Sequence, residues 1–172
     1  MAAGTTFSQI ASTTLGSAAS SVTFSSIPST YTDLVLVANV GSNNDAQVFS
    51  CRINSDTGTN YSITQLLGQG SAASSTRDSS QTKMNISKGV GVTTTNNGMV
   101  VVSNFNNYSN TTTYKTVLSR VGEATGTYIG TAATVGLWRS TAAITSIELS
   151  LNNGTTTFNT GSTFNLYGVT AA

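Results

Sequence analysis

Hydrophobic residues occur along this chain in short clusters, often alternating with polar residues, and β-branched and aromatic types are frequent in them. No cluster is sustained at the spacing of about 3.6 residues that an amphipathic helix requires. Alternation with a period of two is typical of a strand whose two faces meet different surroundings. Ser, Thr, Asn and Gly fill the intervals and favour turns. The pattern therefore predicts short strands joined by turns.

The segment 144–151 shows this alternation most clearly. Ile147, Leu149 and Leu151 share one expected face, and polar residues share the other. The segment 31–40 differs because apolar residues occupy consecutive positions at its centre. Such a sequence predicts a strand covered on both sides, for example one inside an assembled interface.

About ten expected strands, separated by regular turn signals, predict an all-β fold. We expect an antiparallel two-sheet β-sandwich, jelly-roll-like, in a single domain over residues 1–172, with termini that could extend as arms. Residues 71–82 contain no large apolar side chain and are expected to form an exposed loop, as are residues 106–112. The first strand is expected to begin by Phe7, and the others lie at 22–25, 31–40, 48–53, 61–67, 99–105, 114–121, 128–138, 144–151 and 164–169.

The composition excludes most catalytic chemistry. The chain has no histidine, one cysteine and 8% charged residues, against roughly a quarter in ordinary soluble proteins. Serine–histidine and cysteine–histidine catalysis and the common zinc sites need histidine. Paired carboxylates suffice for glycoside hydrolysis, which keeps a carbohydrate-active enzyme as a third class of function. We assign no catalytic, cofactor-binding or metal residues. The six carboxylates are Asp33, Asp45, Asp56, Asp78, Glu123 and Glu148.

Three other groups of residues have a structural and a functional interpretation. Asn54, Asp56, Thr57 and Asn60 offer oxygen atoms to calcium, but they include one carboxylate, so a plain turn is favoured. Cys51 is expected to be a small buried residue. Five aromatic residues could stack on sugars if they were exposed, and packing in a core or interface is favoured for them. These are Tyr61, Tyr108, Tyr114, Tyr128 and Trp138.

The net charge of +1 comes from cations scattered along the chain, so no nucleic-acid partner is expected. No run reaches the length of about 18 apolar residues that a membrane helix needs, and we expect no membrane association. Residues 1–16 lack a basic and apolar leader pattern. We therefore expect synthesis in the cytoplasm without a signal peptide.

Three segments resemble a known family. They are FSQIASTTLGSAASSVTFSSIPSTYTDLVLV at 7–37, CRINSDTGTNYSITQLLGQG at 51–70 and STFNLYGV at 162–169. Together they resemble a group of tailed-bacteriophage virion proteins that share a similar opening, a similar R-x-N-x-D-T-G-x-N-Y-S segment and an ending of the form F-x-L-Y-G. The resemblance implies a location in the virion, other virion proteins as partners and no cofactor.

Within that family, the strand-like sequence favours a compact accessory subunit over a fibre, since it leaves no room for an attachment segment and a shaft. We expect a capsid decoration or cement protein that binds and stabilises the major capsid lattice. The alternative is a tail or tail-fibre subunit, including a receptor-binding tip whose loops 71–82 and 106–112 meet host glycans. Few charges protect the strand edges, so we expect a homo-oligomer, a trimer by analogy. The sequence identifies no interface residues; Leu34 to Val37 are considered, with core burial favoured.

Overall fold

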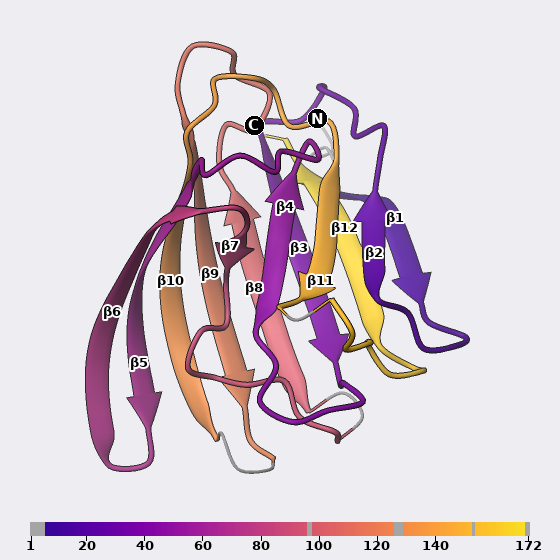
Figure 1. Cartoon of the computed structure of the whole chain (residues 1–172). Coiled ribbons are helices and arrows are strands. Elements are labelled where there is room, and N and C mark those ends of the chain that lie inside the picture. Colours follow the sequence, from indigo (N-terminus) through magenta and orange to yellow (C-terminus); the bar gives the residue numbers. More distant parts are fainter. Residues whose placement is uncertain (1–5, 96–97, 126–128, 153, 171–172) are drawn as a thin grey trace.

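The computed structural model of the protein describes residues 6–95, 98–125, 129–152 and 154–170 (Figure 1). These residues form two antiparallel sheets of eight and four strands, which confirms the predicted all-β sandwich. The jelly-roll detail stays a prediction. Among the described residues, no helix is long and apolar enough to cross a membrane.

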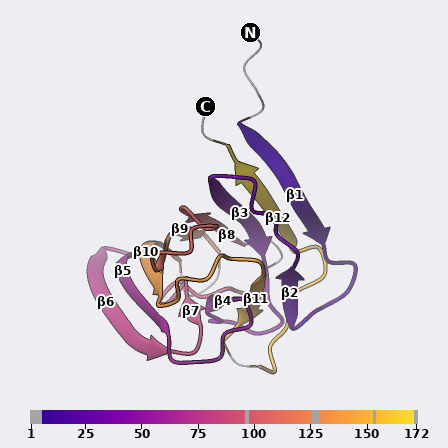
Figure 2. The ribbon, with the colours of Figure 1, turned by 90° about the horizontal axis from the view of Figure 1, so that it is seen from above.

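The larger sheet has the strand order β1-β12-β3-β8-β9-β10-β5-β6, and the smaller has the order β2-β11-β4-β7. Figure 2 shows the larger sheet as an arc, with the smaller sheet on one side of it. The strands of the larger sheet are β1 (Phe7–Thr14), β12 (Thr163–Val169), β3 (Asp33–Val40), β8 (Met99–Phe105), β9 (Lys115–Glu123), β10 (Gly130–Trp138), β5 (Tyr61–Gln69) and β6 (Ala72–Gln81). Those of the smaller sheet are β2 (Ser21–Phe24), β11 (Ile147–Leu151), β4 (Phe49–Ile53) and β7 (Met84–Asn85).

The core lies between the sheets because most strands bury alternate side chains there. One continuous cluster of buried apolar residues joins the two layers. At its centre the ring of Phe158 contacts Phe49 and Phe164, with centroid separations of 5.9 and 5.0 Å. Cys51 lies in this core with no exposed surface, as expected, and burial raises the pKa of its thiol to about 12.

The expectation that segment 31–40 is covered on both sides is wrong for the single chain. In β3, Leu34 and Leu36 are fully buried, while Val35 and Val37 point to the other side and are only partly covered. The reason is the position of β3 in a sheet that has a second layer on one face only. Consecutive apolar residues here mark an apolar outer face.

Residues 71–82 are also different from the expectation, since they contain the strand β6 in place of a loop. This strand pairs with β5 along most of its length, and most of its residues are exposed on both faces. An edge strand beyond the reach of the second sheet needs no apolar side chains, which is why the hydrophobic pattern missed it. Figure 1 shows β5 and β6 at the left, beyond the four-stranded sheet. The irregular segment predicted at 106–112 is confirmed.

Two glycines in neighbouring strands provide a test of which face is packed. A Cβ atom on Gly136 would lie 2.1 Å from the Sδ atom of the buried Met84, whereas one on Gly122 meets nothing within 4 Å. We expect Gly136→Ala to lower the free energy of unfolding by about 1–3 kcal/mol through overpacking. Gly122→Ala should raise it by roughly 0.5 kcal/mol, because alanine suits a strand better than glycine. Urea denaturation of both variants measures the difference, and equal effects would contradict the assignment of faces.

Candidate functional site

The six carboxylates considered for catalysis are each held by a structural contact. None of these contacts joins two carboxylates, and among the described residues no group of three metal-binding side chains occurs. The arrangement thus provides local turns and ion pairs. The contacts are Asp33 with the Asn107 N–H (2.6 Å), Asp45 with the Thr94 N–H (2.9 Å), Asp56 with the Gly58 N–H (2.8 Å), Asp78 with Lys88 (2.5 Å), Glu123 with the Thr125 N–H (2.8 Å) and Glu148 with Arg52 (3.0 Å).

Two of the four residues considered for calcium, Asn54 and Asp56, have side-chain oxygens that accept hydrogen bonds within the chain. Asp56 Oδ2 accepts hydrogen bonds from Trp138 Nε1 (2.6 Å) and Asn60 Nδ2 (2.9 Å). Asn54 Oδ1 accepts the N–H of Thr145 at 2.8 Å. A carboxylate that already receives several N–H groups has little left to offer a cation. The turn interpretation therefore fits the geometry, and the turn fastens the β4–β5 connection to β10.

The hydrogen bonds also control the ionisation of Asp56. Burial alone would raise its pKa, but hydrogen bonds from Trp138, Asn60 and the Gly58 N–H, with the nearby charge of Arg52, bring the pKa below its ordinary value. The ionised form is therefore the one that the native structure favours.

Most of the aromatic candidates for sugar stacking are structural. Tyr61, Tyr108 and Trp138 are buried in the core, which confirms the packing interpretation for them. Tyr114 is 56% exposed, and Tyr128 lies outside the described residues. In the described part of the chain these positions therefore offer one exposed ring.

The outer face of the eight-stranded sheet is not covered by the second sheet. Strand register places Val37, Val102, Arg120, Ala133 and Leu66 in one row across five strands. A second row beside it contains Val35, Asn104, Leu118, Val135 and Thr64. We call these two rows, together with the adjoining row of Val100, Gly122, Thr131 and Gly68, the outer surface.

The outer surface is apolar and open. Leu66 is 65% exposed, Val135 48% and Leu118 40%. With strands about 4.8 Å apart and side chains of one face about 6.8 Å apart, the rows cover a few hundred Å². Patches of that size on soluble proteins commonly mark contact sites for another molecule. This surface is therefore the main candidate for function.

Two hollows flank Arg120 on this surface. One, of about 440 Å³, has Leu66, Gly68 and Ala133 in its lining, and the other, of about 450 Å³, has Val100 and Gly122. The glycines help to form them, since Gly122 has nothing within 4 Å of a Cβ position. Both hollows include Arg120, which is exposed and forms neither of the two ion pairs found among the described residues. The surface thus combines apolar hollows with one unpaired positive charge.

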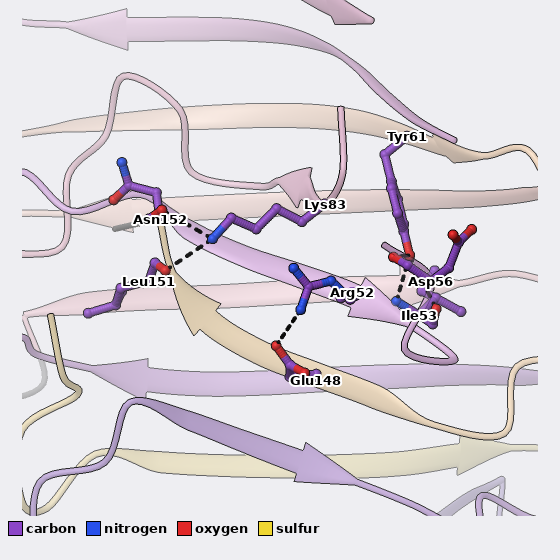
Figure 3. A network of polar contacts seen from close by, with 8 residues as sticks. All are labelled: Arg52, Ile53, Asp56, Tyr61, Lys83, Glu148, Leu151 and Asn152. Atoms are coloured by element: carbon purple, nitrogen blue, oxygen red, sulfur yellow. Dashed lines mark hydrogen bonds and ion pairs between the residues drawn. The ribbon is translucent and has the colours of Figure 1, made fainter. Parts of the chain in front are cut away.

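A second, polar feature lies on the outer face of the four-stranded sheet (Figure 3). Arg52 Nη1 donates to Glu148 Oε1 at 3.0 Å, and Lys83 Nζ donates to the carbonyl oxygens of Leu151 and Asn152, both at 3.2 Å. These side chains border a cleft of about 230 Å³, which we call the polar cleft. Burial, and then the charge of Arg52, lower the pKa of Lys83, while Glu148 opposes this.

Comparisons of the chain with protein-family models, with curated proteins and with solved structures give no match. These comparisons therefore assign no family or function to the chain. Sequence reasoning did not identify the outer surface, although one signal was present. In the strand 99–105 four apolar residues follow one another, so that both faces of the strand receive them.

The hydrogen bond from Trp138 to Asp56 leads to a prediction about stability. Asp56→Ala would leave the indole N–H of the buried Trp138 without an acceptor, and we expect the free energy of unfolding to fall by about 2 kcal/mol or more. Asp45→Ala is the matched control, because it removes an exposed carboxylate that accepts one hydrogen bond from the described residues, from the Thr94 N–H. Its effect should be about 1 kcal/mol or less. Chemical denaturation of both variants measures the loss in free energy of unfolding. Equal losses would contradict a special role for the hydrogen bond between Asp56 and Trp138.

The lowered pKa of Asp56 also predicts how the stability of the protein changes with pH. Because the folded state lowers the pKa of Asp56, its contribution to stability is complete above the ordinary value of about 3.9 and is lost as pH falls through the folded pKa. We expect stability to decrease more steeply with acidification in the native chain than in Asp56→Asn. Unfolding free energies measured between about pH 5 and pH 2 test this, and parallel curves would contradict it.

Proposed function

We propose that this protein is a non-enzymatic virion structural subunit, a capsid decoration or cement protein that binds the major capsid lattice through its outer surface. The observation that carries the proposal is the exposed apolar face across β3, β8, β9, β10 and β5. Burial of such a face against another protein is favourable by roughly 25 cal/mol for each Å² of apolar area removed from water. The location in a virion rests on the sequence resemblance.

The charge distribution favours a different protein as the occupant of the outer surface. A two-fold pairing of this surface centred on Arg120 would bring two guanidinium groups together, which is unfavourable in a dry contact. A lattice protein could place apolar side chains in the two hollows and a carboxylate beside Arg120. Such a partner would complement the outer surface in both polarity and charge. The open edges of β1 and β6 remain for contacts between copies, so a homo-oligomer, with trimer as the expected form, is part of the proposal.

The geometry gives less support to the other two classes. Of the two loops considered for glycan binding by a tail-fibre tip, residues 71–82 form mainly a paired strand. For an enzyme, each of the six carboxylates already has a structural contact. Lattice binding therefore remains the function that the exposed surface supports best.

The test is binding to particles that lack this protein. We expect Leu66→Glu and Val135→Glu each to weaken co-sedimentation with such particles at least about tenfold, because a carboxylate would be buried in an apolar contact. Ser17→Glu, in an exposed turn, adds the same charge elsewhere and should bind normally.

Equal binding by Leu66→Glu, Val135→Glu and the native chain would contradict docking through the outer surface. Binding of the native chain to isolated tails and not to heads would contradict the decoration role and favour the tail alternative.

A further inference from the structure

The polar cleft contains more positive charge than its own residues balance. The two ion pairs found among the described residues are Arg52 with Glu148 and Lys88 with Asp78. Lys83 belongs to neither pair and is held by two carbonyl oxygens. With Arg52, Lys83 and Glu148 on its border, the cleft has a local net charge of +1.

The guanidinium of Arg52 also has unused hydrogen-bonding capacity. Its Nη1 atom contacts Glu148, but its buried Nε atom has no hydrogen-bond partner in the described part of the chain. A buried donor without an acceptor is unfavourable and is uncommon in native structures. The ion pair with Glu148 therefore does not account for the whole environment of Arg52.

Other donors surround the same space. Ser21 and Ser150 face each other across β2 and β11, and their hydroxyl groups border the cleft together with Ser20. Figure 3 shows Lys83 and Arg52 extending side by side over the strands, with Glu148 beyond the guanidinium. The cleft thus presents ammonium, guanidinium and hydroxyl donors from four separate segments.

We propose that the polar cleft binds a single carboxylate group, held between Lys83 and Arg52. A volume of about 230 Å³ is below the roughly 300–1,000 Å³ of pockets for drug-sized ligands, so the occupant is one small group. A carboxylate matches the planar fork of arginine. Its single negative charge would neutralise the excess, whereas a doubly charged phosphate would leave negative charge beside Glu148.

This inference does not depend on the proposed function. The cleft lies on the outer face of the smaller sheet, on the side of the sandwich opposite to the outer surface. The carboxylate could be a free small acid or a glutamate side chain of another protein. Both sources present the same group to Lys83 and Arg52.

The experiment is a titration of the folded protein with sodium acetate, followed by NMR signals of Ser21, Ser150 and the Arg52 Nε–H. Sodium chloride at equal ionic strength is the reference. We expect saturable shifts at these three positions with acetate only. A peptide with one glutamate and capped ends forms the second arm. Tighter binding of the peptide than of acetate identifies a protein side chain as the source, and the reverse order identifies a free acid.

Three variants distinguish a carboxylate site from general charge attraction. Lys83→Met should weaken binding at least about tenfold, which corresponds to about 1.4 kcal/mol. Glu148→Gln should strengthen it, because a repelling charge is removed, and loss of folding cannot produce that result. Lys88→Met removes an equal charge from the connection between β7 and β8. This variant should bind acetate and the glutamate peptide like the native chain.

The proposal is overturned if neither acetate nor the glutamate peptide gives saturable shifts beyond those of chloride. It is also overturned if Lys83→Met and Lys88→Met have equal effects, since binding would then follow the total charge of the protein.

Discussion

The inner face of an eight-stranded sheet is covered here by a sheet of only four strands, and the remaining features follow from that inequality. Successive side chains of a strand point to opposite faces of the sheet. When one set is buried against the smaller sheet, the other set therefore lies on the outer face. In β3, β8, β9 and β10 that outer set includes valine and leucine. A second covering layer is therefore missing from the single chain, and another protein is the proposed source of it.

The chain has few charged residues, and several of them hold connections through hydrogen bonds to neutral groups. The Asp56 carboxylate receives the indole of Trp138 and the amide of Asn60, and the buried Lys115 ammonium donates to the carbonyls of Thr113 and Thr141. Burial lowers the pKa of Lys115. These ionisable groups thus hold local connections, whereas Arg52, Lys83 and Glu148 leave a net positive charge at the polar cleft.

Alternation in the sequence was sufficient to predict the sandwich and most strands, because one buried face per strand leaves a period of two. It failed at β6, where neither face is buried and no apolar signal exists. At β3, consecutive apolar residues indicate two apolar faces, but they do not tell whether the second face is covered within the chain or by another protein. The outer surface depends on register between distant strands, such as Val37 with Val102, and the polar cleft on the approach of Lys83 to Arg52. Neither pairing has a local sequence signal.

The most direct test of the central claim is an imaging reconstruction of the assembled particle that resolves strands. The account predicts that the face formed by β3, β8, β9, β10 and β5 lies against the capsid lattice, with a lattice carboxylate near Arg120 and apolar side chains in the two hollows. A reconstruction in which that face points to solvent, while the particle contacts run through the smaller sheet, would contradict it.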